Sequence, residues 1–207
     1  MSRIIIFDFD GTIVDSMPRL ADIASGLINR YFGLSSEVSR DLYMLTSGLP
    51  FVEHMEYIFP GKKENREIVE EFERKKEDEV MNEPLFPETK EVLAALAGRG
   101  DKVVISSSNF QHIMEGYIKE CGLTPDLVLG YREGFSKGRD HFDYIKKHFQ
   151  ADTEDLVFVG DSLRDFGKAR DNGVRFIGRI GTFTADDFKE AGADEVIHDL
   201  RELVRVL

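Results

Sequence analysis

Five short, mostly apolar runs constrain the fold of this chain more than any other feature. They are Ile4–Phe7, Val103–Ile105, Leu127–Leu129, Leu156–Val159 and Arg175–Ile177. Because apolar residues follow one another in these runs without alternating with polar ones, each run is typical of a strand buried on both faces, as in parallel sheets. Helical patterns such as Phe142, Ile145 and Phe149 separate the later runs. The alternation predicts a doubly wound α/β fold built on a parallel sheet.

A long helical stretch interrupts this alternation after the first run. From Ile6 to Val103 the sequence contains no convincing strand, and an apolar stripe with helical spacing extends from Met17 to Tyr31. Ser16 is expected to cap this first helix. We therefore predict a helical insertion over residues 16–83, which leaves residues 1–15 and 84–207 as the α/β core. The segment that returns to the core is expected to form a helix ending near Gly98 or Gly100.

Composition narrows the classes of partner. The chain has 207 residues, of which 42% are hydrophobic, and this supports a folded core. The formal net charge of −12 disfavours nucleic acids and anionic membranes as partners, because both require basic surfaces. The sequence contains no membrane-spanning run and no signal peptide, and its single cysteine, Cys121, is expected to be buried and unable to form an internal disulfide. We expect a cytoplasmic protein; the oligomeric state cannot be predicted.

Polar side chains follow four successive runs, at the sheet edge where open α/β sheets bind their ligands. They are, in chain order, Asp8 and Asp10, Ser106–Asn109, Lys137, and Asp161 and Asp165. Asp8 and Asp10 are two positions apart on an extended chain, so their side chains point the same way. Two carboxylates placed together repel each other unless a cation or a proton joins them.

The residue types at this edge indicate phosphoryl transfer. Oxygen-only ligands favour Mg²⁺ over a softer metal, and the sequence has no pair of His or Cys residues at the spacing of a zinc site. A lysine and hydroxyl groups facing such a cluster would bind the oxygens of an anion. Carboxylates, Mg²⁺, Lys and Ser around one anion are typical of phosphoryl-transfer sites.

Four motifs carry a resemblance to a known family. "DFDGT", the hydroxyl of "VVISSS", "SKG" and "GDSLRD" resemble, in this order, the motifs of the haloacid dehalogenase-like superfamily, and most closely its phosphatases of the phosphoglycolate-phosphatase kind. The segment "FTADDFKEAGADEVIHDLREL" is similar to the end of those proteins. The resemblance implies a Rossmann-like core with a helical cap inserted after the first strand. It also implies a Mg²⁺-dependent phosphatase that hydrolyses a small phosphomonoester.

The resemblance also implies a role for each motif residue. Asp8 would be the nucleophile that forms an aspartyl-phosphate, and Asp10 the acid and base. Ser106 would donate a hydrogen bond to a phosphoryl oxygen, and Lys137 would neutralise Asp8 and the phosphoryl group. Mg²⁺ would be held by Asp8, the main-chain carbonyl of Asp10 and Asp161, with Asp165 supporting this set. The expected substrate contacts are Gly11, Thr12, Ser107 and Asn109, together with Ser47 and Gly48 of the insertion.

The expected role of Ser47 and Gly48 comes from "TSGLPF", residues 46–51, which separates two helical stripes of the insertion. The family's cap places a Gly-containing loop of this kind over the phosphoryl site, and Phe51 is expected to pack on the leaving group. An ordinary connection between two helices remains the alternative.

Two other functions share parts of this pattern. Sugar-phosphate mutases of the superfamily carry all four motifs, but the matching loop here is apolar or acidic where theirs is basic. A phospho-receiver signalling domain also gathers Asp, Ser or Thr and Lys around Mg²⁺ at a sheet edge. Its phosphoacceptor ends the third strand, where this chain has Leu129-Gly130-Tyr131 and no Asp.

Overall fold

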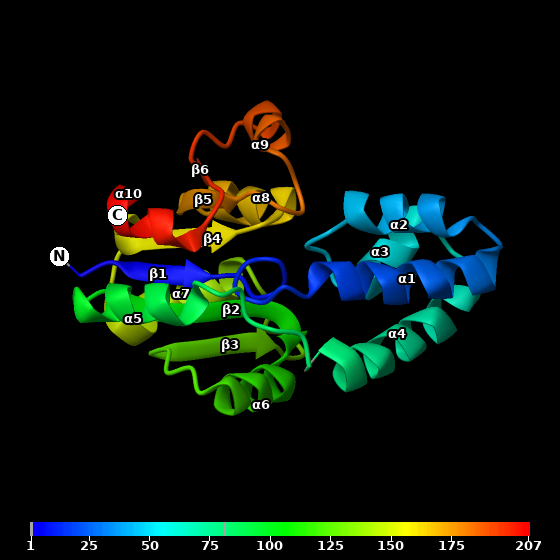
Figure 1. The fold of residues 1–207 in the computed structure, drawn as a ribbon, viewed down its shortest axis with the longest axis horizontal. Helices are drawn as coiled ribbons and strands as arrows, with labels where there is room; N and C mark the ends of the chain where they lie inside the picture. Colours follow the sequence, from blue (N-terminus) through cyan, green and yellow to red (C-terminus); the bar gives the residue numbers. More distant parts are fainter. Residues whose placement is uncertain (1, 81) are drawn as a thin grey trace. The chain divides into compact units, whose positions relative to one another are not determined.

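The computed structural model describes residues 2–80 and 82–207 (Figure 1). The chain divides into two compact units. The core unit consists of Met1–Val14 and Leu85–Leu207, and the helical unit consists of Asp15–Pro84. The expected boundaries of the insertion, 16 and 83, differ from these by one residue at each end.

In the described residues the strands of the core unit form one six-stranded sheet, and every paired neighbour is parallel. The strands are β1 (Ile4–Phe7), β2 (Lys102–Phe110), β3 (Leu127–Tyr131), β4 (Leu156–Gly160), β5 (Arg175–Arg179) and β6 (Val196–Ile197). Their order across the sheet is β3-β2-β1-β4-β5-β6. The chain builds one side of the sheet from β1 to β3 and the other from β4 to β6, so the connections diverge between β1 and β4. The predicted doubly wound parallel sheet is confirmed, and the diverging point is where such sheets bind ligands.

Helices cover both faces of this sheet (Figure 1). They are α5 (Thr89–Gly98), α6 (Gln111–Cys121), α7 (Arg139–Phe149), α8 (Leu163–Asp171), α9 (Ala185–Ala191) and α10 (Leu203–Val206), with short 3₁₀ turns at Thr153–Asp155 and Leu200–Glu202. Ile4 and Ile6 lie in one buried cluster with Phe142 of α7. Ile5 and Phe7 point to the opposite face and are buried as well. Burial on both faces explains why β1 is apolar at every position.

Two parts of the sheet differ from the sequence-based prediction. The strand β6 was not predicted, because two residues are too short to produce an apolar run. Ser106–Asn109 were expected to follow the second strand, but they lie within β2, where pairing with β3 shifts register between Ser106 and Phe110. Backbone pairing with a neighbouring strand keeps these polar residues extended, and their side-chain types alone do not reveal it.

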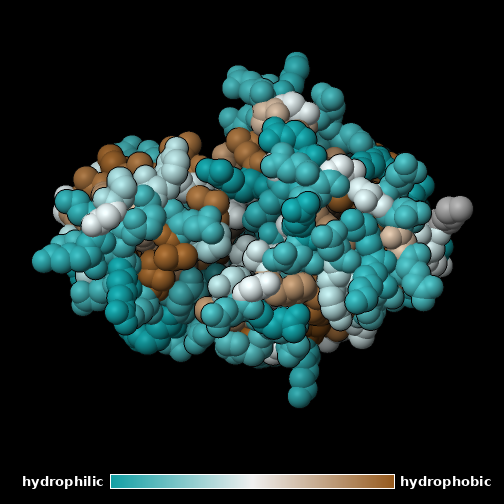
Figure 2. All heavy atoms as spheres, turned by 180° about the vertical axis from the view of Figure 1, so that it is seen from behind, coloured by the Kyte–Doolittle hydropathy of each residue, from teal (hydrophilic) through white to brown (hydrophobic). Residues whose placement is uncertain are grey.

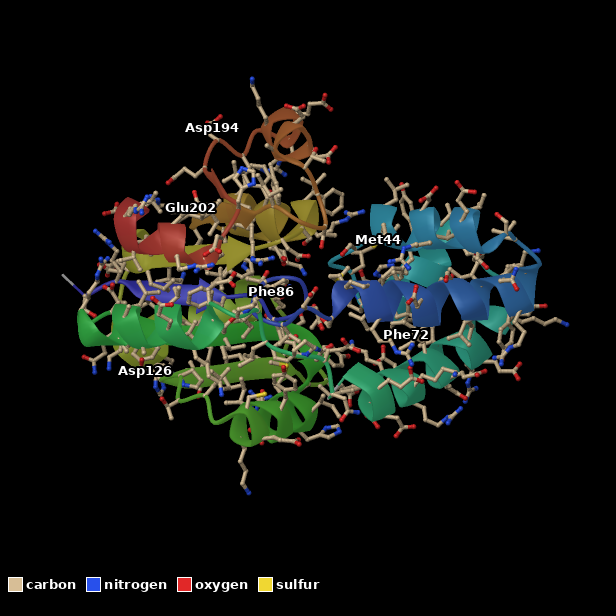
Figure 3. All side chains as sticks on the ribbon, viewed as in Figure 1. Met44, Phe72, Phe86, Asp126, Asp194 and Glu202 are labelled. Carbon is tan, nitrogen blue, oxygen red and sulfur yellow. The ribbon has the colours of Figure 1, made fainter. Side chains whose placement is uncertain are left out.

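The helical unit contains α1 (Met17–Phe32), α2 (Ser36–Leu45), α3 (Phe51–Ile58) and α4 (Glu64–Val80). Its core includes Leu20 and Leu27 of α1 together with stacked aromatic rings. The rings of Phe51 and Phe72 lie 3.7 Å apart, and Tyr43 packs at 6.2 Å from both (Phe72 is labelled in Figure 3). The expected helical insertion therefore has a hydrophobic core of its own.

Two sequence-based details of these helices were wrong. Ser16 occupies the cap position of α1, but its side chain makes no capping hydrogen bond. Pro18 lies at the start of the helix, as its position in the sequence also predicts, and its missing N–H costs no hydrogen bond there. Cys121 is only half-buried, because it is the last residue of α6.

Hydrophilic residues cover most of the face of the molecule drawn in Figure 2. This surface agrees with the high share of charged residues, 32% of the chain. Among the helices that the structure describes, none has both the length and the hydropathy needed to span a membrane.

Candidate active site

Three buried carboxylates meet at the carboxyl ends of β1 and β4. Asp8 follows β1 and Asp161 follows β4, while Asp165 lies in the first turn of α8. The main-chain N–H of Asp8 donates to the carbonyl of Val159 at 2.8 Å, which extends the pairing of β1 with β4. Each of the three carboxylates offers an oxygen, and these oxygens all lie within 4.8 Å of one another. We call Asp8, Asp161 and Asp165 the carboxylate cluster.

Lys137 lies against this cluster. Its Nζ is 2.6 Å from Oδ1 of Asp8 and 2.7 Å from Oδ1 of Asp165, and its side chain is only 4% exposed. Burial by itself would lower the pKa of Lys137, but the charges of Asp165 and Asp8 outweigh burial and hold the pKa above its usual value. Lys137 therefore stays cationic in the folded protein.

The charges of the cluster do not balance. One ammonium faces three carboxylates, so two negative charges remain in a buried site. Burial raises the pKa of Asp8 to about 6 although Lys137 opposes this shift. Burial and the neighbouring charges of Asp8 and Asp165 also raise the pKa of Asp161 well above its usual value. A divalent cation would supply the missing charge, and an all-oxygen donor set suits Mg²⁺.

A tight turn follows Asp8. Gly11 has φ of +73°, a left-handed conformation that glycine adopts without strain. The N–H groups of Ile13 and Val14 both donate to the carbonyl of Phe9. Thr12 Oγ1 donates to Asp8 Oδ2 at 3.3 Å, so the turn folds back on the carboxylate from which it starts. Gly11 and Thr12 were expected beside the site, and the structure places Thr12 against Asp8.

The polar residues of β2 form a second group. Asn109 Nδ2 donates to Asp10 Oδ2 at 2.8 Å, and the main-chain N–H of Asn109 donates to Ser107 Oγ at 3.0 Å. The structure thus joins Asn109 to Asp10 across 99 positions of the sequence. The carboxylate of Asp10 is not part of the carboxylate cluster, and the expected metal contact of Asp10 is through its main-chain carbonyl. That metal contact stays a prediction.

Sequence reasoning missed three residues at this sheet edge. Arg179 ends β5, and its Nη1 donates to the carbonyl of Gly11 at 3.1 Å. Thr182 Oγ1 donates to Oδ2 of Asp161. His141 Nδ1 lies 2.8 Å from Ser106 Oγ. Arg179 could have been found by looking for polar residues at the end of the fifth apolar run, as was done for the other runs. No sequence signal indicated His141 or Thr182.

Ser47 and Gly48 lie in the helical unit, between α2 and α3. Ser47 is buried, and Gly48 has φ of +88°. His54 holds this connection: its Nδ1 is 2.6 Å from Thr46 Oγ1 and its Nε2 is 2.9 Å from the carbonyl of Leu49. The relation of Ser47 and Gly48 to a substrate stays a prediction.

The expectation for Phe51 was wrong. Its ring is stacked on Phe72 within the helical unit and is only 4% exposed, so the ring is used in the core of that unit. The exposed apolar residues at the two ends of this connection are Leu45 and Val52, which are 66% and 52% exposed.

A family model matches most of this chain, including the four motifs that the sequence analysis identified. The family model described as "Haloacid dehalogenase-like hydrolase" matches residues 5–179. The chain belongs to the haloacid dehalogenase-like hydrolase family.

Curated relatives of this family member are phosphatases. A Dickeya dadantii protein described as "Probable phosphatase IndB" is 25% identical, over 99% of this chain and 93% of that protein. The phosphoglycolate phosphatase of Synechococcus elongatus is 28% identical over 82% of this chain and 80% of its own length. These relatives confirm the predicted enzyme class, a haloacid dehalogenase-type phosphoric monoester hydrolase that is similar to phosphoglycolate phosphatases.

Solved structures share the fold of this hydrolase. A haloacid dehalogenase-like family hydrolase from Streptococcus pneumoniae has a TM-score of 0.83 at 18% identity, covering 99% of this chain and 98% of the other. A hydrolase from Pseudomonas syringae has a TM-score of 0.82 at 20% identity, covering 99% and 97% of the two chains. At these identities the likeness concerns the fold alone.

Proposed function

We propose that this hydrolase is a Mg²⁺-dependent phosphatase that cleaves a small phosphomonoester through an aspartyl-phosphate on Asp8. The observation that carries the proposal is the ion pair of Lys137 with Asp8 inside the carboxylate cluster. A carboxylate that has one cationic partner and an excess of negative neighbours is suited to share its site with a metal ion and a phosphoryl group.

In the first step, a carboxylate oxygen of Asp8 attacks phosphorus and the ester bond of the substrate breaks. Asp10 gives its proton to the departing ester oxygen. In the second step, Asp10 takes a proton from water, and the resulting hydroxide attacks phosphorus and releases inorganic phosphate, which regenerates the carboxylate of Asp8. The hydrogen bond from Asn109 to Asp10 supports this assignment, because it holds the acid and base in place for both steps.

Other residues of the site would bind and neutralise the phosphoryl group. We assign charge neutralisation to Lys137 and hydrogen bonding of a phosphoryl oxygen to Ser106, with Gly11, Thr12 and Ser107 lining the same group. A bound Mg²⁺, held by Asp8, Asp161 and the main-chain carbonyl of Asp10, would supply Lewis-acid stabilisation of the phosphoryl oxygens. Asp165 would support this set through Lys137 and through Ser162, which donates to Asp165 at 2.8 Å.

The substrate is proposed to be a small anionic monoester. Two phosphoglycolate phosphatases among the relatives make phosphoglycolate the first compound to test. The net charge of −12 leaves little general attraction for anions, so such a substrate depends on cations inside the site. The charge also supports our proposal that the enzyme has no nucleic acid or membrane partner, and its single cysteine supports the proposal that it acts in the cytoplasm.

We further propose that the helical unit acts as the cap and that the connection at residues 46–51, apart from the buried ring of Phe51, meets the leaving group. The hydrogen bonds of His54 to Thr46 and Leu49 support this role, because a loop that selects among substrates must keep its shape. Replacement of the half-buried Leu49 by Arg should change KM between small and large monoesters, while Val38→Arg, an exposed change on α2, should not. Equal KM values for the parent enzyme and Leu49→Arg on every substrate would identify residues 46–51 as an ordinary connection.

The main experiment measures phosphate release from a panel of monoesters that includes phosphoglycolate and an aryl phosphate. Asp8→Asn should abolish release, and Asp171→Asn, an exposed carboxylate on α8, should not. Acid quenching during turnover should trap a phosphoryl group on Asp8, and trapping on another residue would overturn the mechanism.

The mutase alternative is tested with β-glucose 1-phosphate and a bisphosphate primer. Glucose 6-phosphate forming faster than free phosphate would overturn the hydrolase assignment.

A further inference from the structure

The end of β2 departs from the regular pairing of the sheet. From Ser106 to Phe110 the strand β2 advances four positions, while its partner β3 advances two. The extra residues of β2 include Asn109, whose side chain donates to Asp10. Extra residues in one strand are left out of the backbone ladder, so the pairing of β2 with β3 does not by itself fix where Asn109 lies.

Gln111, the first residue of α6, binds β3 directly after these extra residues. Its Oε1 accepts from the main-chain N–H of Gly130 at 2.6 Å, and its Nε2 donates to the carbonyl of Val128 at 3.0 Å. Because a main-chain N–H can only donate and a carbonyl can only accept, these partners fix which end of the amide is which. A residue of a neighbouring parallel strand makes the same two contacts, so the side chain of Gln111 binds β3 as a strand would.

Gly130 allows the chain after β2 to approach β3 closely. A Cβ atom at Gly130 would lie 2.6 Å from Cα of Gln111 and 2.8 Å from the main-chain oxygen of Asn109. Both distances are far shorter than the 3.5–4.0 Å or so of a favourable non-bonded contact. Any side chain at this position would therefore displace the end of β2 or the start of α6.

Asn109 transmits this anchoring to Asp10. Asn109 is buried, and its main-chain N–H donates to Ser107 Oγ at 3.0 Å while its Nδ2 donates to Asp10 Oδ2 at 2.8 Å. Gln111 follows only two positions later, so a shift of Gln111 away from β3 would move Asn109 as well. Hydrogen bonds weaken steeply as their geometry departs from linear, and the contact with Asp10 would be lost first.

We propose that Gln111 is a positioning residue for Asp10. Its two hydrogen bonds to β3, together with the close approach at Gly130, fix the end of β2 and hold the amide of Asn109 against Asp10. The catalytic part of this inference rests on the proposed function of Asp10 as acid and base. The anchoring of Asn109 does not, so it can be measured without turnover.

The first test is the mobility of the Asn109 side-chain amide, measured by ¹⁵N relaxation in the full-length protein without substrate and assigned by comparison with Asn109→Ala. Gln111→Met removes both hydrogen bonds to β3 but keeps a side chain of similar length and helix propensity. We expect the order parameter of the Asn109 amide to fall in Gln111→Met. Glu120→Ala, an exposed change on α6, is the control and should leave it unchanged. An unchanged order parameter in Gln111→Met would overturn the proposal whatever the activity of the enzyme.

The second test separates the two chemical steps by rapid quenching with an aryl phosphate. Gln111→Met should slow hydrolysis of the aspartyl-phosphate roughly fivefold, or about 1 kcal/mol. Formation of the intermediate should change little, because an aryl leaving group needs little protonation. In an Asn109→Ala background the same substitution should have little further effect. Equal slowing of both steps, or an equal effect with and without Asn109, would show a merely structural role and overturn the proposal.

The third test acts from β3. Gly130→Ala should slow hydrolysis of the intermediate and lower the order parameter of the Asn109 amide. The control is Gly98→Ala, at an exposed glycine where an added Cβ meets no atom within 4 Å. Hydrolysis at the parental rate in Gly130→Ala would overturn the proposal. If this variant does not fold, Gln111→Met decides alone, because it introduces no clash. Full activity of Asp8→Asn would instead overturn the proposed function and leave the relaxation result standing.

Discussion

Lys137 Nζ lies 2.6 Å from Asp8 Oδ1, and both side chains are buried. The pair joins the end of β1 to the loop before α7, two segments separated by 129 positions in the sequence. Because Lys137 also contacts Asp165, a single ammonium joins a carboxylate at the end of β1 to one in the first turn of α8.

Loss of this ammonium should reduce activity and metal-free stability together. Lys137→Met would leave three buried carboxylates without a cationic partner, and removal of one partner of a buried pair costs about 3–5 kcal/mol. We expect a lower urea midpoint in EDTA and a loss of kcat of at least roughly 10², since a charge facing the phosphoryl group is removed. Lys147→Met, an exposed change on α7, is the control and should alter neither. Unchanged kcat in Lys137→Met would contradict the role of Lys137.

Asp10 should act mainly in the second step when the leaving group is good. An aryl phosphate needs little protonation on departure, so Asp10→Asn should still form the aspartyl-phosphate but hydrolyse it slowly, by a factor of roughly 10²–10⁴. Rapid mixing should show a burst of aryl alcohol close to one equivalent per active site, followed by slow turnover. Asn109→Ala, which removes the hydrogen bond to Asp10, should give a smaller effect of the same kind. A linear time course in Asp10→Asn without a burst would contradict the assignment.

Mg²⁺ should stabilise the protein more at neutral than at acidic pH. The pKa of Asp8 is raised to about 6 by burial, so the folded metal-free protein binds more protons than the unfolded chain below that pH. The contribution of this carboxyl to metal-free stability is therefore largest at low pH and is lost as the pH rises through about 6. Protons and Mg²⁺ compete for the same oxygens, so the rise in Tm with Mg²⁺ should be larger at about pH 7.5 than at about pH 5.

The control for this measurement is Asp161→Asn, which removes one carboxylate from the cluster. This variant should have a higher Tm than the parent in EDTA at about pH 7.5, and a smaller rise in Tm with Mg²⁺. A rise in Tm that is the same at both pH values would contradict binding of the metal by these carboxylates. Full phosphatase activity in the presence of EDTA would contradict the requirement for a metal.

The buried pair of Arg179 and Glu88 should stabilise the turn after Asp8. Arg179 Nη2 is 3.4 Å from Glu88 Oε1, and its guanidinium carbon lies 3.6 Å from the ring centroid of Phe86, which is labelled in Figure 3. Arg179→Met would leave the buried carboxylate of Glu88 unpaired and the carbonyl of Gly11 without this donor. We expect a loss of about 3–5 kcal/mol in the free energy of unfolding.

Two variants test this reasoning. The double variant Arg179→Met with Glu88→Leu should recover much of the lost stability, because no unpaired buried charge remains. Arg170→Met, which breaks an exposed ion pair with Asp171, should cost at most about 1 kcal/mol. Urea unfolding gives the free energy of unfolding of each variant. If Arg179→Met alone lowered this free energy by less than about 1 kcal/mol, the prediction would be contradicted.

The sequence by itself determined the type of fold and most of the residues at the sheet edge. Apolar runs such as Ile4–Phe7 have one physical explanation, burial on both faces, and this is possible in a parallel sheet covered by helices. In such a sheet, residues that follow different strands meet at the same edge. Asp8, Lys137 and Asp165 could therefore be predicted to lie together although they are far apart in the chain.

Only the tertiary structure decided which side chains contact one another. The pairing of Ser106 with His141, of Asn109 with Asp10 and of Arg179 with the carbonyl of Gly11 depends on how β2, α7 and β5 are set against the turn after Asp8. None of these contacts is a property of local spacing. A hydrogen bond forms over a few tenths of an ångström and a narrow range of angles, whereas an apolar run specifies only which faces are buried.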